Sequence, residues 1–88
     1  MEPELSISEK RNSANLLRKK GDTHGAIELY EQIWELEKTA WDGKFLAICK
    51  RQEGRLDESR EYVDYVKSHF PDFKPILSDE LWLDYQNV

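Results

Sequence analysis

Apolar positions recur at three- and four-residue spacing along most of the chain, which is the pattern of amphipathic helices. The clearest case is the segment 24–38, where seven apolar residues are separated by four glutamates. The same periodicity predicts helices over residues 8–20, 40–53, 57–69 and 75–86. No stretch alternates between apolar and polar residues as a half-buried strand would. The sequence therefore predicts an all-α fold of five helices.

Residues at the expected helix boundaries fit this division. Gly21 and Gly54 each follow a basic, helix-favouring stretch, and a glycine in the left-handed conformation commonly ends a helix. Ser6 followed by Glu9 has the pattern of an N-terminal capping box. Pro71 prevents the fourth helix from continuing. We therefore expect the chain to reverse near Gly21, Thr39, Gly54 and residues 71–74.

The chain contains a weak internal repeat, because a shift of 33 residues superimposes one half on the other. Small residues, the turn glycine and several charged residues coincide after this shift. The matched pairs include Ala14 with Ala47, Arg18 with Arg51, Gly21 with Gly54, Ala26 with Ser59, and Glu28 with Glu61. A helix–turn–helix unit of 33–34 residues is the period of tetratricopeptide repeats.

The segment from Ala14 to Tyr30 resembles a tetratricopeptide repeat in the order of its small residue, bulky residue, Gly21-Asp22 turn, alanine and aromatic residue. The second copy keeps Leu46-Ala47, Gly54, Ser59 and a closing Pro71. The resemblance implies a right-handed solenoid of helical hairpins. It places two repeats at about residues 6–38 and 39–71, a capping helix at 72–88, and a flexible N-terminus at 1–5.

The resemblance is incomplete at several positions. Lys10 and Gly43 replace the family's bulky residue near the start of each repeat, and Lys50 stands where an aromatic residue is usual. An unrelated five-helix bundle with coincidental spacing is the alternative. In either case the spacing predicts a buried core at the contacts between paired helices. Its members are Ala14, Leu17, Ala26, Tyr30, Ile33, Leu46, Ala47, Ser59, Val63 and Val66.

The last helix is expected to act as a cap on the second repeat. Leu77, Leu81 and Tyr85 lie four residues apart and form one helical stripe. We expect this stripe to cover the exposed end of the repeats. The acidic residues of the same segment, Asp79, Glu80 and Asp84, are then expected to face water.

Composition narrows the class of protein. The chain is 39% apolar and 11% aromatic, which indicates a folded rather than a disordered protein. A single cysteine, Cys49, excludes an internal disulfide and favours a reducing compartment, so we expect a cytoplasmic protein. No apolar run approaches the roughly 20 residues that a membrane span needs, and no membrane partner is expected.

No residue pattern indicates catalysis or metal binding. His24 and His69 are far apart in the sequence and belong to no metal-ligand spacing. Cys49 lies among apolar residues, as a buried, unreactive thiol would. We therefore predict a protein without enzymatic activity and without a metal or cofactor.

Charge is distributed unevenly, although the whole chain carries −5. The first predicted helix has five cations against one glutamate, and the second has four glutamates against one lysine. The first helix of each pair lines the concave groove of tetratricopeptide arrays, so the resemblance implies a basic groove. The positions that it assigns to partner binding are Arg11, Asn15, Arg18, Lys19, Trp41, Lys44, Ile48 and Arg51, with Ser8 and Gln52 beside them.

These observations favour a protein-interaction module that binds an acidic, partly apolar peptide or helix in this groove. Trp41 and Ile48 would supply the apolar contacts. One alternative is a structural subunit, in a homodimer or a larger complex, whose groove is filled by protein. Another is nucleic-acid binding, which the net negative charge disfavours. A third interpretation is that the charges only complement helix dipoles and pair across turns.

Overall fold

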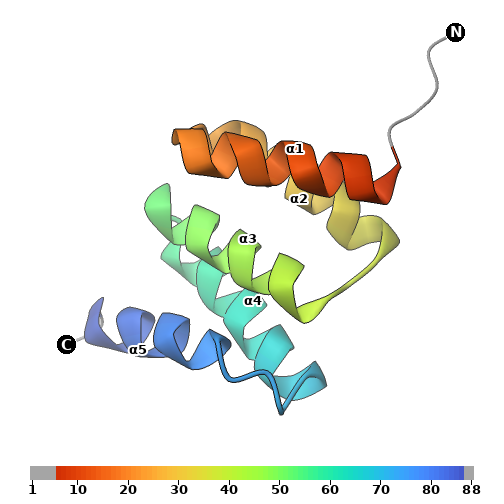
Figure 1. Ribbon diagram of the computed structural model, residues 1–88. Helices are drawn as coiled ribbons and strands as arrows, with labels where there is room; N and C mark the ends of the chain where they lie inside the picture. The colour runs from red at the N-terminus through yellow and green to blue at the C-terminus, as the bar shows by residue number, and fades with distance from the viewer. Residues whose placement is uncertain (1–5, 87–88) are drawn as a thin grey trace, which may run out of the picture.

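The computed structural model describes residues 6–86, and within this range the chain is built from helices and short turns (Figure 1). The helices are α1 (Ile7–Lys20), α2 (Thr23–Leu36), α3 (Ala40–Gln52), α4 (Leu56–His69) and α5 (Ile76–Gln86). No strand occurs between residues 6 and 86. The predicted all-α class and five helices are therefore confirmed. The expected flexible segment 1–5 and the end of the expected cap, 87–88, lie outside the described residues.

The helix boundaries follow from local chemistry, as the sequence predicts. Gly21 and Gly54 adopt the left-handed conformation, with φ of 90° and 79°. The Ser6 hydroxyl accepts a hydrogen bond from the backbone N–H of Glu9 at 3.1 Å, which begins α1. Asp22 and Thr39 cap α2 and α3 in the same way. These caps satisfy backbone N–H groups that have no partner inside the helix.

The helices form successive hairpins. α1 packs on α2 and α3 packs on α4, while α2 also contacts α3 and α5 contacts both α4 and α3. Figure 1 shows α1, α3 and α5 one below the other on the near side, with α2 and α4 behind them. This arrangement of helix pairs is compatible with a helical-repeat solenoid.

Two adjoining clusters of apolar residues form the core. One contains residues of α1, α2 and α3, and the other joins α3, α4 and α5. Nine of the ten predicted core residues are buried, and Leu17 is half-buried against the first cluster. Between α3 and α4 the hydroxyl of Ser59 donates a hydrogen bond to the carbonyl oxygen of Ala47 at 2.7 Å. The small residues of the repeat thus mark a close helix contact.

Gly43 departs from the repeat pattern because there is no space for a larger residue at this position. A Cβ atom added to Gly43 would lie 2.5 Å from Cγ2 of Val66 and 3.2 Å from the ring of Trp34. Trp34 also packs edge-on against Tyr62 and Tyr65 of α4. The glycine therefore allows α3 to approach both α2 and α4 closely.

The expected orientation of the last helix is wrong. Ile76, Asp79 and Leu83 are the buried residues of α5, whereas Leu77, Leu81 and Tyr85 expose 42%, 64% and 80% of their surface. Of the three acidic residues expected to face water, Asp84 is exposed, Glu80 is half-buried and Asp79 is buried. Helix α5 therefore contacts the repeats through a mixed apolar and acidic face.

None of the helices between residues 6 and 86 has both the length and the apolar composition that a membrane span requires.

Candidate protein-interaction surface

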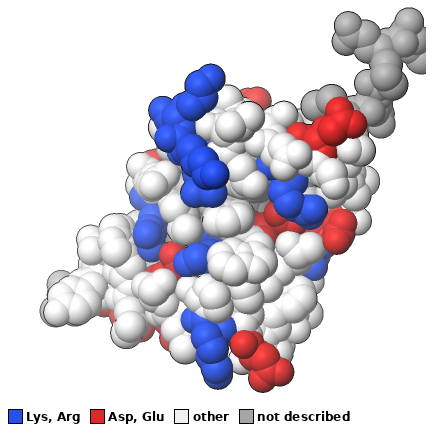
Figure 2. All heavy atoms as spheres, in the orientation of Figure 1, with Lys and Arg blue, Asp and Glu red and all other residues white. Residues whose placement is uncertain are grey.

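The residues predicted to bind a partner lie on α1 and α3. These two helices, together with α5, form one surface, which we call the first-helix face. Figure 2 shows it in the orientation of Figure 1, with Lys and Arg side chains gathered over the C-terminal end of α1. The last turn of α1 contains Arg18, Lys19 and Lys20. Elsewhere on this face positive and negative side chains lie close together.

Arg11 makes a bidentate ion pair between the α1–α2 hairpin and the α3–α4 hairpin. Its Nη2 and Nε atoms lie 2.7 Å and 3.0 Å from the two carboxylate oxygens of Asp42, which is fully buried. The hydroxyl of Thr39 also donates a hydrogen bond to Asp42, at 2.7 Å. The hydrogen bond to Asp42 raises the pKa of Arg11. Arg11 is therefore engaged within the chain, where it connects α1 to α3.

Lys44 and Arg51 are both engaged by α5. The Lys44 amino group lies 2.5 Å from one carboxylate oxygen of Asp79, and Nη1 of Arg51 lies 3.1 Å from the other. The guanidinium of Arg51 also stacks on the ring of Trp82, 4.7 Å from its centroid. These two cations explain why α5 buries Asp79. A buried carboxylate needs a counter-charge, and α3 supplies two.

The two aspartates occupy equivalent places in the stack of helices α1, α3 and α5. Arg11 and Lys44 are 33 residues apart, the length of the repeat. Each extends from the first helix of a repeat to a buried aspartate in the first turn of the next such helix. The sequence analysis did not predict these ion pairs. The signal that could have indicated them was an aspartate in the first turn of both α3 and α5, Asp42 and Asp79.

Asn15 and Arg18 are held in place by Tyr30 of α2. The Tyr30 hydroxyl donates a hydrogen bond to the side-chain oxygen of Asn15 and accepts one from Nε of Arg18 at 3.2 Å. Burial raises the pKa of Tyr30. The guanidinium of Arg18 stacks on Phe45, 4.3 Å from the ring centroid. Within residues 6–86 Arg18 forms no ion pair, so its charge is not neutralised by a carboxylate.

Trp41 is the large exposed apolar residue among the predicted binding positions, with 51% of its surface accessible. Its ring lies 5.8 Å from that of Phe45 and packs edge-on against Phe73 at 4.9 Å. Ile48 is half-buried on the same helix, and Lys19 is exposed on α1. Trp41 is thus half-exposed while its ring packs against two other aromatic rings.

An open depression of about 440 Å³ lies beside this aromatic group. It is lined by residues of α3, of the end of α4 and of the connection between α4 and α5: Ala40, His69, Phe70, Pro71, Asp72 and Phe73. Phe73 borders the depression and also contacts Trp41. Phe73 is therefore the residue through which Trp41 adjoins the depression, which Trp41 itself does not line.

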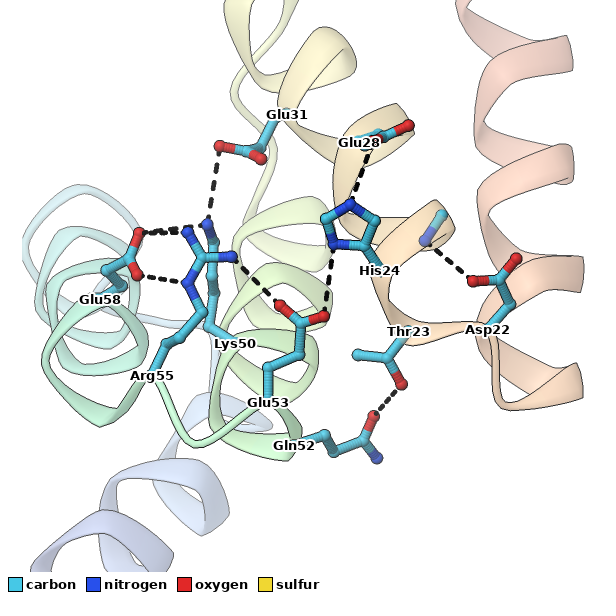
Figure 3. A network of polar contacts seen from close by, with 11 residues as sticks. Asp22, Thr23, His24, Glu28, Glu31, Lys50, Gln52, Glu53, Arg55 and Glu58 are labelled. Carbon is cyan, nitrogen blue, oxygen red and sulfur yellow. Dashed lines mark hydrogen bonds and ion pairs between the residues drawn. The ribbon is translucent and has the colours of Figure 1, made fainter.

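A second polar cluster joins the ends of α2, α3 and α4 (Figure 3). His24 lies between Glu28 and Glu53, with nitrogen–oxygen distances of 3.2 Å and 3.5 Å. Arg55 pairs with Glu53 at 3.1 Å and with Glu58 at 2.5 Å. The basic groups Lys50 and Arg55 each meet carboxylates within this cluster. The cluster therefore links the repeats to each other.

Lys50 explains one departure from the repeat pattern. Its side chain is buried, and its amino group lies 3.2 Å from Glu58 and 3.6 Å from Glu31. Hydrogen bonds from Arg55 and Lys50 lower the pKa of Glu58. A lysine takes the place of the usual aromatic residue because carboxylates of α2 and α4 meet its charge. Gln52, one of the flanking groove positions, is hydrogen-bonded to Thr23 at 3.3 Å.

The described residues hold few groups with reactive chemistry. Between residues 6 and 86 no three or more His, Cys, Asp or Glu side chains are grouped so that they can hold a metal ion. Cys49 is buried and unpaired. Burial raises the pKa of its thiol to about 11, so the nucleophilic thiolate is scarce at neutral pH.

Comparison with models of known protein families, with curated proteins and with solved structures gives no match. The resemblance to tetratricopeptide repeats therefore rests on the residues themselves, and the helix pairs are compatible with it. Functional inference depends on the geometry of the first-helix face.

Proposed function

We propose that this chain is a non-enzymatic protein-interaction module built from two tetratricopeptide-like hairpins and a terminal helix. It binds an acidic, partly apolar peptide or helix on the first-helix face. The observation that carries this proposal is the half-exposed Trp41, fixed between Phe45 and Phe73 beside an open depression. Buried, unpaired Cys49 fits a reducing compartment such as the cytoplasm.

A bulky side chain of the partner would enter the depression and pack against Trp41 and Phe73. Tryptophan is enriched among the residues that dominate binding energy, especially where its ring is held in one conformation. The Trp41 ring already packs against Phe45 and Phe73 in the free chain, so we expect it to lose less side-chain entropy on binding than a tryptophan without such contacts.

The charge of the first-helix face favours an acidic partner. Its five predicted cations lie with two buried aspartates, which leaves a net charge of +3 over these seven residues. Arg18 and Lys19 contribute most directly because neither is paired with a carboxylate within residues 6–86. Attraction by exposed cations is screened by salt, whereas the apolar contact at Trp41 is not. Binding should therefore weaken with salt without disappearing.

The spacing predicts that Arg11, Lys44 and Arg51 contact the partner. In this proposal these three cations instead position the helices that form the binding surface. Their ion pairs with Asp42 and Asp79 hold α1, α3 and α5 at fixed positions. The partner therefore meets a surface that is already formed. Such preorganisation lowers the entropy cost of binding.

A fluorescence-anisotropy titration with a pool of labelled peptides tests this function. Each peptide carries one bulky residue among acidic residues, and the control pool replaces the acidic residues with lysine. We expect the acidic pool alone to yield binders. Trp41→Ala should weaken them at least tenfold, because truncating a tryptophan hot spot costs more than about 1.4 kcal/mol.

A matched pair of charge reversals tests the electrostatic part. Lys19→Glu and Lys20→Glu should each weaken binding, because both exposed lysines belong to the basic last turn of α1. Far-UV circular dichroism verifies that each variant remains folded. Equal binding by folded Trp41→Ala and the wild type would show that the site lies elsewhere.

A further inference from the structure

Three aromatic rings and one glutamate line a second open depression, between α2 and α4. The depression has a volume of about 260 Å³, and its lining residues are Trp34, Glu61, Tyr62 and Tyr65. Figure 1 shows α2 and α4 behind α1, α3 and α5. The depression therefore belongs to the second helices of the two hairpins and not to the first-helix face.

The rings stand at nearly right angles to each other. The planes of Trp34 and Tyr62 meet at 80°, and those of Trp34 and Tyr65 meet at 72°, with ring centroids 5.5 Å and 5.1 Å apart. Trp34 is buried and the two tyrosines are half-buried, so the tryptophan forms the floor. Aromatic rings attract cations, and rings grouped around a cavity bind quaternary ammonium groups in this way.

The chain itself shows that this group of rings attracts a cation. The amino group of Lys38 lies 5.5 Å from the centroid of the Trp34 ring and donates a hydrogen bond to the Trp34 carbonyl oxygen at 3.0 Å. Lys38 is exposed and is not among the residues that line the depression. The depression therefore adjoins an existing cation–π contact without being filled by it.

The surroundings of the depression are acidic. Helix α2 carries three glutamates and no lysine or arginine, and α4 carries four acidic residues against two basic ones. Burial raises the pKa of Tyr62, and three glutamates raise it further: Glu31, Glu58 and Glu61. Glu31 and Glu58 pair with Lys50, whereas Glu61 forms no ion pair within residues 6–86. An unpaired carboxylate beside aromatic rings favours a positively charged ligand.

We propose that this depression binds the trimethylated side chain of a lysine in a partner protein. The methyl groups pack against the three rings, and Glu61 supplies the counter-charge. An unmethylated ammonium group fits less well, because it is strongly hydrated and must lose that water to enter an aromatic site.

Charge complementarity favours a peptide chain over a small free cation. In an open depression a molecule such as choline would stay largely in contact with water. A peptide also brings basic residues on either side of the modified lysine to the carboxylates of α2 and α4. This is a binding site beyond the proposed function, because it shares no residue with the acidic-peptide site at Trp41 and Phe73.

Isothermal titration calorimetry with three short peptides tests the proposal. The peptides differ at one position between two lysines, which holds trimethyllysine, lysine, or the neutral analogue in which carbon replaces the trimethylammonium nitrogen. We expect trimethyllysine to bind at least about fivefold more tightly than the other two, as a desolvated cation–π contact allows. Equal binding of the neutral analogue or of unmodified lysine overturns the proposal, as does choline binding as tightly as the peptide.

Variants of the lining residues test the rings and the charge separately. Tyr65→Leu should weaken trimethyllysine binding at least about fivefold, whereas Tyr65→Phe keeps the ring and should bind like the wild type. Glu61→Gln should weaken binding more than Asp64→Asn, because Asp64 is exposed on the same helix but does not line the depression. Far-UV circular dichroism verifies that each variant is folded. Equal binding by folded Tyr65→Leu and the wild type overturns the proposal.

NMR spectroscopy shows which tryptophan meets the ligand. The indole N–H signal of Trp34 should shift on addition of the trimethyllysine peptide, and that of Trp41 should not. A shift of Trp41 alone overturns the proposed location. Failure of the first-helix face is separate, because Trp41→Ala should abolish acidic-peptide binding and retain trimethyllysine binding, while Tyr65→Leu should do the reverse.

Discussion

Replacing Asp79 with asparagine tests whether α5 is held by its buried carboxylate. The side chain keeps its size but loses the charge that lies 2.5 Å from Lys44 and 3.1 Å from Arg51. One amide oxygen remains to accept a hydrogen bond, and the amide nitrogen faces a cation. The substitution therefore leaves at least one cation without a counter-charge.

The expected loss follows from how deeply the three groups are buried. Breaking a fully buried ion pair costs about 3–5 kcal/mol, and an exposed pair contributes about 0.2–1 kcal/mol. The Asp79 side chain is 4% exposed, but those of Lys44 and Arg51 are 14% and 21% exposed, so both cations keep some contact with water. We expect the free energy of unfolding to fall by about 2–3 kcal/mol. For a domain of this size that lowers Tm by roughly 10–20 °C.

Thermal and urea unfolding, followed by far-UV circular dichroism, measure this loss. The protein concentration must be low enough that self-association does not add to stability. Glu80→Gln is the matched control, because Glu80 also pairs with a cation, Lys67, but at a more exposed position. It should cost less than about 1 kcal/mol. If Asp79→Asn lowers the free energy of unfolding no more than Glu80→Gln does, the buried ion pairs of Asp79 do not hold α5 against α3.

Two further predictions concern the core. Gly43→Ala should lower the free energy of unfolding, measured by urea titration, by up to about 2 kcal/mol. The clash with Val66 costs about 1–3 kcal/mol, whereas the better helix propensity of alanine returns only about 1 kcal/mol. A more stable variant would show that α3 can shift to make room for the added methyl group. Alkaline pH should destabilise the fold, because burial raises the pKa of the Cys49 thiol from about 9 to about 11 and also raises the pKa of Tyr30. The folded chain then holds these protons more tightly, so stability is complete below about pH 9 and falls as pH rises through 11. Urea midpoints at several pH values measure the fall, and it should be smaller in Cys49→Ala.

Local chemistry explains why the sequence predicts the helix boundaries well. Ser6, Gly21 and Thr39 act through the backbone within three or four residues, so their effect does not depend on the rest of the fold. The buried alanines are equally accessible to prediction, because only a small residue fits where two helices approach closely.

The orientation of α5 depends on residues far away in the sequence, and for this reason it was not predicted. The stripe Leu77–Leu81–Tyr85 is the more apolar side, and burial of apolar area alone would turn it inward. Lys44 and Arg51 precede Asp79 by 35 and 28 residues, and only the packing of α5 against α3 brings them together. Periodicity within one helix carries no information about such counter-charges.

The sequence predicted which helices carry the candidate site, but not which of its cations are paired within the chain. Spacing assigned Trp41 and the cations to α1 and α3, which do lie side by side (Figure 1). It did not indicate that Asp42 would neutralise Arg11, since an aspartate in a first helical turn ordinarily faces solvent and favours the helix dipole. Whether a cation is free or paired depends on the rotation of one hairpin against the next.

The order of helix contacts has a consequence for how fast the chain folds. The extensive contacts join α1 to α2, α2 to α3, α3 to α4 and α4 to α5, which are all neighbours in sequence, together with α3 to α5. Short sequence separation between contacting residues gives fast folding, and in a stack of hairpins either hairpin can form first. Asp79 finds its counter-charges only after α3 is in place, so α5 should be the last helix to dock. Loss of that carboxylate should then speed unfolding and leave the folding rate nearly unchanged.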